Sequence, residues 1–343
     1  MVLQFRNNQN KAIFEGIIMK AIVYTKYGSP DVLELKEVEK PTPKDDEVLV
    51  KVHAASLNAA DLDFLRGRFQ PPFSRKPRYE ILGSDIAGRI EAVGKEVKQF
   101  QPGDEIFGDL FGRGLGAFAE YVCAPENAIS LKPASMTFEE VATLPQAGLL
   151  ALQGLRDKKQ IQLGQKVLIN GAGGGMGTFA VQIAKFFGAE VTGVDSTNKL
   201  DMVRSIGADH VIDYTQEDFT KSGQRYDLIL DVVAYRSIFD YKRALNPKGI
   251  FLAVGGSGAA ILKFLFLGPL ITMFGSKKIG ILMWKQNKKE DFSFLIELIE
   301  AGKVVPVIDR RYRLSDVAKA LRYLEEGHHQ GKLVIIVEHN NKS

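Results

Sequence analysis

The sequence predicts an α/β protein in which a β-rich domain is followed by a doubly wound parallel sheet. Its 343 residues favour two domains, at roughly 150 residues for each domain. Up to about residue 131, short β-like runs are separated by turns that contain Pro and Gly. After Pro133, apolar strands alternate with helical segments, which is the pattern of a parallel sheet with crossover helices.

The β-rich part contains alternating or apolar runs and no long stretch of helical period. We expect strands at residues 21–24, 48–52, 86–90 and 118–122. Turn signals at residues 28–30, 41–43 and 102–104 separate these strands.

The second part begins with a helix expected over residues 136–156. Further strands are expected at residues 166–170, 190–194, 211–213, 228–231, 250–254, 304–309 and 332–337, and helices at residues 177–187, 198–206, 291–301 and 314–326. We assign residues 1–18 to an N-terminal extension, residues 19–140 and 290–343 to the β-rich domain, and residues 141–289 to the parallel-sheet domain.

The extension lacks the features of a targeting segment. Residues 1–18 have neither the basic start nor the apolar run of a secretory signal, and they contain one Arg and no Ser, unlike a transit peptide. No window of the chain reaches the roughly 18 uncharged apolar residues of a membrane-spanning helix.

Composition and charge exclude several classes of function. Apolar residues make up 45% and charged residues 25%, as in an ordinary globular enzyme. The net charge of +4 is small and is expected to be spread along the chain, which argues against a nucleic-acid partner. The single cysteine, Cys123, excludes an internal disulfide and any zinc site with two thiolates. It fits a reducing compartment, so we expect a cytoplasmic protein.

A glycine cluster follows the strand expected at residues 166–170. It consists of Gly171, Ala172, Gly173, Gly174, Gly175, Met176 and Gly177, and it opens a helix rich in Ala, Val and Ile. Glycines at such a turn allow the backbone to approach a pyrophosphate and the helix to pack closely on the sheet. The cluster therefore predicts dinucleotide binding.

The end of the next strand leaves the choice of dinucleotide open. Asp195 favours NAD, because a carboxylate here accepts hydrogen bonds from the ribose hydroxyls and repels a 2′-phosphate. Ser196, Thr197 and Lys199 offer hydroxyls and a cation that suit a phosphate instead.

Six ordered motifs over about 300 residues resemble the medium-chain dehydrogenase/reductase superfamily. They are Ser56-Leu57-Asn58-Ala59-Ala60-Asp61 with Arg66-Gly67, Gly83-Ser84-Asp85-Ile86-Ala87-Gly88, Gly103-Asp104-Glu105-Ile106-Phe107-Gly108, Leu144-Pro145-Gln146-Ala147-Gly148, the 172–177 loop, and Gly331-Lys332-Leu333-Val334-Ile335. Within the superfamily the chain resembles the zinc-independent NADPH:quinone oxidoreductase branch.

The resemblance implies a GroES-like catalytic domain plus a Rossmann domain, and a cofactor site. Lys199 and Tyr214 have the spacing of the residues that hold the 2′-phosphate in NADPH-using relatives, so the resemblance favours NADP(H). Because of Asp195, NAD(H) is retained as the alternative cofactor. Val254, Gly255, Gly256 and Ser257 are expected to line the nicotinamide side, and Lys332 is also assigned to the cofactor site.

The resemblance also bears on metal binding. The three positions that hold catalytic zinc in zinc-dependent relatives correspond to Asn58, Ser84 and Gln146, none of which is a good zinc ligand. We therefore expect no metal. Of the histidines, His328 and His329 are expected to form an exposed pair near a turn.

Without zinc to stabilise an alkoxide, oxidation of simple alcohols is disfavoured, and hydride transfer to a lipophilic quinone or conjugated enone is expected. As catalytic candidates, Asn58 is expected to hydrogen-bond the acceptor oxygen, and Asp61 to orient that amide or Arg66. Both residues could instead only shape the pocket.

Asp85 is expected to be a buried turn or capping carboxylate, and Cys123 is expected to pack in the core. The alternative functions are an enoyl-thioester reductase and a cofactor-binding protein of low turnover with a structural role.

The apolar segment at residues 259–284 has two interpretations. The first is packing at the sheet edge and in the interface of a homodimer, which is the assembly we expect. The second is a lip that admits a long-tailed quinone or touches a membrane surface, since lysines flank the segment.

Overall fold

The computed structural model describes residues 18–69, 76–158, 160–273 and 275–339, so the predicted extension at residues 1–18 lies almost wholly outside the described residues. The chain divides into two compact units. The first unit comprises the chain up to Pro145, residues 310–327 and the chain from Leu333 onward; the second comprises residues 146–309 and 328–332. These units differ from the predicted domains at residues 141–145, 290–309 and 328–332.

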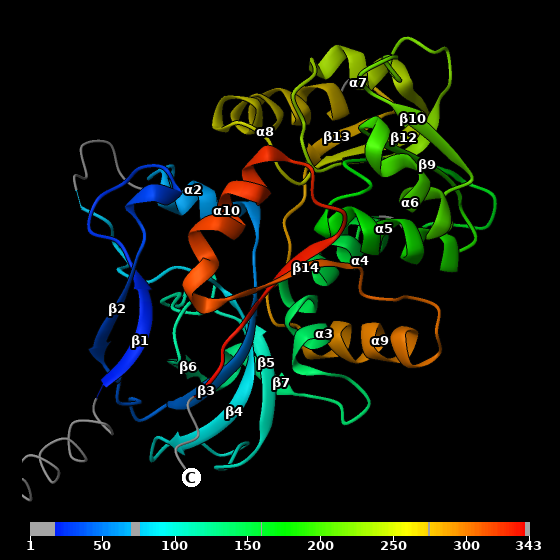
Figure 1. The fold of residues 1–343 in the computed structure, drawn as a ribbon. Helices are drawn as coiled ribbons and strands as arrows, with labels where there is room; N and C mark the ends of the chain where they lie inside the picture. The colour runs from blue at the N-terminus through cyan, green and yellow to red at the C-terminus, as the bar shows by residue number, and fades with distance from the viewer. Residues whose placement is uncertain (1–17, 70–75, 159, 274, 340–343) are drawn as a thin grey trace, which may run out of the picture. The chain divides into compact units, whose positions relative to one another are not determined.

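The first unit is built on a mainly antiparallel sheet (Figure 1). Among the described residues this sheet has seven strands, in the order β14-β15-β3-β4-β5-β7, with β6 paired to β3. Strands β1 and β2 form a separate two-stranded sheet. The bounds are β1 Ile18–Val23, β2 Glu34–Glu39, β3 Glu47–Ser56, β4 Asp85–Val93, β5 Glu105–Asp109, β6 Tyr121–Pro125, β7 Ile129–Leu131, β14 Ile308–Arg313 and β15 Lys332–Ile336.

Three helices of the described residues accompany these sheets, namely α2 Ala59–Leu65, α3 Phe138–Ala142 and α10 Val317–Glu326. The core forms because β3 alternates its side chains between the two faces of the sheet, and Val48, Val50 and Val52 are fully buried. The predicted GroES-like domain is therefore present as a β-rich fold.

The second unit is a parallel sheet of six described strands in the order β10-β9-β8-β11-β12-β13. The strand bounds are β8 Lys166–Asn170, β9 Glu190–Asp195, β10 His210–Asp213, β11 Tyr226–Asp231, β12 Leu245–Ala253 and β13 Lys278–Ile281. The helix bounds are α4 Leu149–Arg156, α5 Gly175–Phe186, α6 Leu200–Ser205, α7 Ile238–Ala244, α8 Gly258–Met273 and α9 Lys289–Glu300. This strand order, with crossover helices, confirms the predicted Rossmann fold.

Several predicted elements differ in the structure; the strand expected at residues 118–122, for example, forms three residues later, as β6. The single helix expected over residues 136–156 is divided into α3, a π-helical turn at Leu144–Gly148 and α4, because Pro145 lacks the N–H that would continue a regular helix. The strand expected at residues 304–309 forms four residues later, as β14. The apolar segment at residues 259–284 contains most of α8 and all of β13.

Helices α7 and α8 pack through aromatic side chains near the edge of the parallel sheet that is formed by β12 and β13. Tyr241 of α7 and Phe264 of α8 both contact Phe251 of β12, with ring centroids 4.0 and 5.0 Å apart, and all three are buried. Within the described ranges, no helix combines the length and the apolar character needed to cross a bilayer.

Candidate cofactor site and buried acidic cluster

The glycine cluster forms a tight loop between β8 and α5. Gly171 has φ +85°, a conformation that favours glycine, and the amides of Gly171 and Ala172 donate to the Val194 carbonyl of β9 at 2.9 and 3.1 Å. A Cβ on Gly177 would lie 2.1 Å from the Gly171 oxygen. The loop therefore holds the α5 N-terminus against the carboxyl ends of two parallel strands, where Rossmann folds bind dinucleotides.

Asp195, at the end of β9, is hydrogen-bonded to this loop. Its Oδ2 accepts a hydrogen bond from the Gly173 amide at 2.7 Å, and its Oδ1 accepts one from the Ser196 amide at 2.9 Å. Lys199 Nζ lies 3.5 Å from the same Oδ1, and both side chains are buried. Both carboxylate oxygens thus accept hydrogen bonds inside the protein.

The surface next to Asp195 is polar and partly exposed. The Tyr214 amide donates to the Asp195 carbonyl at 3.1 Å, so Tyr214 lies beside the end of β9, and this residue is 47% exposed. Ser196 Oγ donates to Asn198 Oδ1 at 2.7 Å, and Thr197 Oγ1 donates to Asp213. The hydroxyls predicted to suit a phosphate are therefore gathered at this end of the sheet.

A segment far along the chain completes the loop. The Gly331 amide donates to the Gly173 carbonyl at 2.9 Å, and a Cβ on Gly175 would lie 2.6 Å from Lys332 Cδ. Lys332 is buried, so its stem packs on the start of α5. Lys199 does the same at Gly173, where an added Cβ would lie 2.8 Å from Lys199 Cδ. Two lysines therefore border the glycine loop.

The structure corrects the expectation of an exposed histidine pair. His328 is exposed, whereas His329 is partly buried, with its Nε2 3.9 Å from the position of a Cβ on Gly174. Burial and, next, the Lys199 charge lower the pKa of His329 to about 4, so the ring is neutral at pH 7. Sequence reasoning missed this neighbour of the loop, and its only signal was its place just before the Gly331-Lys332 motif.

The predicted nicotinamide loop follows β12. The Val254 amide donates to the Asp231 carbonyl at 2.8 Å, and Gly256 has φ +132°. Ser257 Oγ accepts from the Ala260 amide at 3.2 Å, and so caps the start of α8. Val254, Gly255, Gly256 and Ser257 thus lie at the carboxyl end of the sheet, the end that also carries the glycine loop.

In the first unit, Asn58 and Asp61 form the start of α2. The Asn58 amide N–H donates to Asp61 Oδ2 at 2.8 Å, so Asp61 caps the helix. The Asn58 side chain also contacts Asp85, because its Nδ2 donates to Asp85 Oδ2 at 2.9 Å. Asp85 therefore orients the Asn58 amide. The Arg66 guanidinium forms a separate ion pair, with Glu325.

Asp85 also belongs to a buried pair of acids. It opens strand β4 directly opposite Asp109 of β5, and both side chains are fully buried. It is a strand residue and not the turn or capping carboxylate expected from the sequence; Ser56 Oγ donates to it at 3.0 Å. Burial and, next, the Asp85 charge raise the pKa of Asp109 to about 8, far above the usual range of a carboxyl group. Asp109 was not predicted as a site residue.

The three positions corresponding to zinc ligands do not suit the metal. Asn58, Ser84 and Gln146 are buried, but they offer neutral amide and hydroxyl groups where zinc prefers thiolate, imidazole or carboxylate. In the part of the chain that the structure describes, no group of three His, Cys, Asp or Glu side chains is arranged to hold a metal ion. Cys123 lies half-buried in β6, and burial raises its pKa to about 12.

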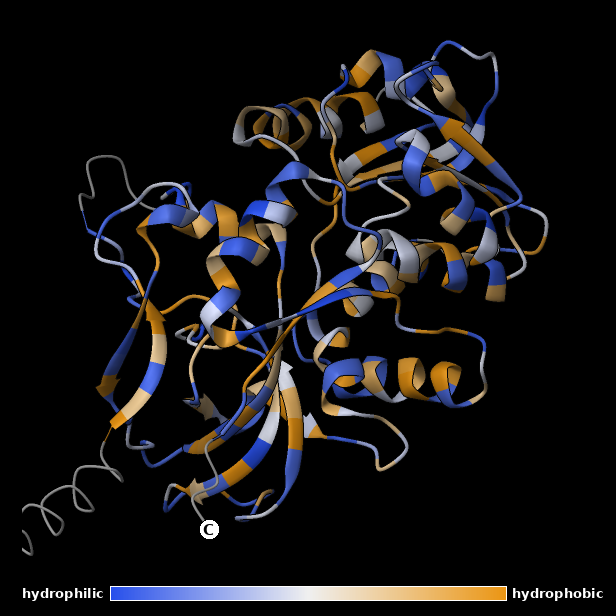
Figure 2. Ribbon diagram, viewed as in Figure 1, coloured by the Kyte–Doolittle hydropathy of each residue, from blue (hydrophilic) through white to orange (hydrophobic). Residues whose placement is uncertain are grey.

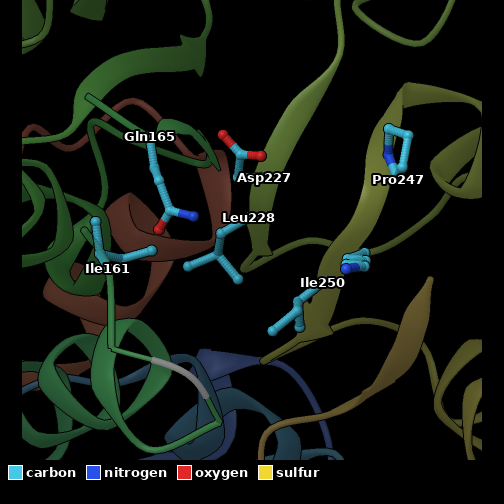
Figure 3. A pocket seen from close by; sticks show the side chains of 7 residues that line it. Ile161, Gln165, Asp227, Leu228, Pro247 and Ile250 are labelled. Atoms are coloured by element: carbon cyan, nitrogen blue, oxygen red, sulfur yellow. The ribbon is translucent and has the colours of Figure 1, made fainter. Parts of the chain in front are cut away.

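A small cavity of about 130 Å³ lies elsewhere in the second unit (Figure 3). Its lining includes Asp227 and Leu228 near the start of β11 and Gln165 just before β8, so it is at the amino ends of the strands. Asp227 accepts hydrogen bonds from the Lys166 amide and from Asn246 Nδ2. The Asp227 carboxylate therefore already has hydrogen-bond donors within the protein. The cavity lies at the amino ends of the strands, whereas dinucleotides bind at the carboxyl ends.

Comparison with known protein families matches both parts of the chain. Residues 44–134 match the family described as alcohol dehydrogenase GroES-like domain, and residues 206–335 match the family described as zinc-binding dehydrogenase.

Individual relatives match along most of the chain. A 2-methylene-furan-3-one reductase of Solanum lycopersicum is 35% identical over 92% of this chain and 79% of its own length. The chloroplast envelope quinone oxidoreductase homolog of Arabidopsis thaliana is 34% identical over 93% of this chain and 99% of its own.

Among solved structures, the Escherichia coli quinone oxidoreductase complexed with NADPH has a TM-score of 0.82 and 26% identity, over 92% of this chain and 99% of its own. The CurK enoyl reductase has a TM-score of 0.81 and 26% identity, over 93% of this chain and 99% of its own.

Proposed function

Because the chain belongs to the quinone oxidoreductase branch of the medium-chain dehydrogenase/reductase superfamily, we propose that it transfers a hydride from NADPH to a quinone or a conjugated enone without zinc. The chain is an NAD(P)H-dependent reductase by its family. The observation that carries the proposal is the glycine loop with two lysines packed on it, at the carboxyl edge of a Rossmann sheet.

The preference for NADPH rests on Asp195 and Lys199. A carboxylate with both oxygens engaged by Gly173, Ser196 and Lys199 is poorly placed to accept from ribose hydroxyls. The Lys199 cation and the Tyr214 hydroxyl then hold the 2′-phosphate, with Ser196 beside them. The amides at the start of α5 bind the pyrophosphate, and Lys332 adds a second cation.

When bound, NADPH supplies the hydride. The role of the second unit is to hold the nicotinamide against the 254–257 loop, so that the hydride faces the acceptor in a fixed orientation. The role of Asn58 is to donate a hydrogen bond to the acceptor oxygen as negative charge develops there. Asp85 is a positioning residue, since its hydrogen bond to Asn58 Nδ2 fixes the amide.

Steady-state NADPH oxidation tests this function directly. We expect turnover with a short-chain quinone and with a conjugated enal, and little turnover with an enoyl thioester. Preferred turnover of the thioester would favour the activity named for the CurK enoyl reductase instead. Tight NADPH binding with no turnover of any acceptor would favour a structural role and contradict the proposal.

Location and assembly are part of the proposal. We propose a homodimer, as expected from the sequence, and size-exclusion chromatography with light scattering tests it. The cytoplasmic location stays a prediction, and the Arabidopsis thaliana relative is named for the chloroplast envelope. Imaging of the tagged full-length chain in its native cell tests the location.

A further inference from the structure

Helix α8 carries an unusual amount of exposed apolar surface. Of the 18 large apolar side chains that are exposed among the described residues, six lie on this one helix: Leu262, Leu265, Phe266, Leu267, Leu270 and Met273. Leu262, Phe266, Leu270 and Met273 recur at spacings of three and four residues, so they share one face. Figure 2 shows α8 coloured largely as hydrophobic. Contiguous exposed apolar patches of this kind mark interaction surfaces.

The opposite face of α8 fixes the helix to the sheet. Phe264 is buried against Phe251, and a Cβ on Gly268 would lie 2.5 Å from the Ile279 carbonyl oxygen of β13. Thr272 Oγ1 accepts a hydrogen bond from the Ile279 amide at 3.2 Å. An apolar groove of about 370 Å³ lies between the helix and β13. The exposed face is therefore presented by a firmly packed element.

The positive charge of the chain is concentrated in the stretch of sequence that contains this helix. Residues 241–289 contain nine Lys or Arg residues and no Asp or Glu, so the rest of the chain has a net charge of −5 against the overall +4. This corrects the expectation that the charge is spread along the chain. Lys263 on α8 and Lys278 just after it are exposed. Burial, followed by the charges of Arg225 and Lys242, lowers the pKa of Lys277, which indicates that these cations lie close together.

We propose that the exposed face of α8 docks on the surface of an anionic lipid bilayer, with its apolar side chains in the interface and the surrounding lysines on the headgroups. An apolar face bordered by cations is the pattern of interfacial membrane binding. At 16 residues the helix is about 24 Å long, shorter than the roughly 30 Å hydrocarbon core, so it lies on the bilayer and does not span it.

Charge also distinguishes this occupant from a second copy of the chain. A two-fold dimer places the same patch of both copies face to face. Around α8 that arrangement would bring two cation-rich segments together, and like charges across an interface oppose association. An anionic bilayer instead neutralises them.

The position of α8 links docking to the reaction. The helix begins at Gly258, directly after the 254–257 loop assigned to the nicotinamide, and Ser257 caps it. Docking would bring that loop close to acceptors dissolved in the bilayer, such as long-tailed quinones. This link rests on the proposed function, whereas docking itself does not.

Vesicle flotation with the full-length chain tests the docking. We expect a bound fraction with vesicles that contain phosphatidylglycerol, little binding to pure phosphatidylcholine, and loss of binding as salt rises. Phe266→Glu/Leu270→Glu and Lys263→Glu/Lys278→Glu should each weaken binding by about tenfold or more. The matched controls change exposed residues elsewhere in the second unit: Leu163→Glu for the apolar pair and Lys158→Glu/Lys303→Glu for the lysines.

Each contrary result overturns the proposal. Absence of binding to anionic vesicles at low salt does so, and so does equal binding by wild type and the α8 variants. A change in solution mass of Phe266→Glu/Leu270→Glu, without vesicle binding by wild type, would identify a self-association surface. Failure of the proposed function is separate, because it would abolish NADPH turnover and leave flotation unchanged.

Discussion

Lys199 Nζ lies 3.5 Å from Asp195 Oδ1, and both side chains are buried against the glycine loop. This ion pair bears on a conflict within the sequence, where Asp195 favours NAD(H) and Lys199 favours NADP(H). Since the carboxylate is already held by the Gly173 amide and by Lys199, its charge is balanced inside the loop. A 2′-phosphate next to Ser196 and Tyr214 would then not be repelled by a free Asp195 charge.

Removing the lysine should weaken NADPH selectively. We expect Lys199→Ala to raise the Kd of NADPH by about tenfold or more and to change that of NADH much less, because only NADPH carries the 2′-phosphate. Fluorescence titration with both cofactors measures this, with Lys303→Ala as the matched control. The double variant Lys199→Ala/Asp195→Asn, which removes both charges, should likewise raise the Kd of NADPH much more than that of NADH. Equal losses for NADPH and NADH would contradict the phosphate assignment.

Removing the Asn58 amide should slow the reaction and leave cofactor binding intact. If Asn58 contacts the acceptor oxygen, Asn58→Ala should lower kcat/KM for a quinone by roughly a hundredfold, the effect of losing one such donor. The Kd of NADPH should not change. Asn127→Ala, at an exposed position of the same unit, is the control. An unchanged kcat/KM in Asn58→Ala would show that Asn58 only shapes the pocket or caps α2.

The raised pKa of Asp109 predicts how stability depends on pH. Its folded pKa of about 8 lies far above the roughly 3.9 of an unfolded chain, so between these values the folded state holds a proton that the unfolded state has lost. The free energy of unfolding should therefore fall as pH rises from about 4 to about 8, by up to about 1.4 kcal/mol per pH unit from this group. Above pH 8 the contribution levels off.

Asp109→Asn isolates this contribution, since asparagine resembles the protonated acid and does not titrate. Urea unfolding at pH 5 and pH 8 should show a smaller loss of stability in the variant than in wild type. Asp46→Asn, at an exposed position of the same unit, should retain the wild-type difference. The same pH dependence in Asp109→Asn and wild type would show that Asp109 is ionised in the folded protein.

The close packing of α5 predicts a stability effect at Gly177. A Cβ there would lie 2.1 Å from the Gly171 oxygen, so Gly177→Ala must displace the loop, and we expect a loss of about 1–3 kcal/mol. Gly280→Ala is the control, because nothing lies within 4 Å of its added Cβ. Denaturant unfolding of both variants measures the difference. Equal stability would contradict the close approach of helix and loop.

The sequence carried enough local information for the sheet that holds the cofactor site. The strand expected at residues 166–170 is β8, and the one at 190–194 lacks only Asp195 of β9. These strands are short, apolar and bounded by glycine or polar residues, so their limits are set locally. β14 lies four residues from its predicted position, because the pairing of an edge strand depends on its partner β15.

The candidate site was predictable only where a motif marks it. The glycine loop, Asp195 and Lys199 follow from strand–turn–helix spacing, but their mutual pairing depends on how the loop folds. Asp109 and His329 carry no local signal, since their environment is set by residues distant in the chain: Asp85 on the neighbouring strand, and Lys199 beside the glycine loop. The exposure of α8 is likewise a property of the folded sheet edge, because the same apolar sequence would suit a buried helix.

The most direct test of the account is steady-state turnover of a short-chain quinone with NADPH and NADH side by side. We predict that the purified protein, with no added zinc and with chelator present, reduces the quinone and that kcat/KM for NADPH exceeds that for NADH by at least about tenfold. Turnover that requires zinc, or that is equal with the two cofactors, would contradict it.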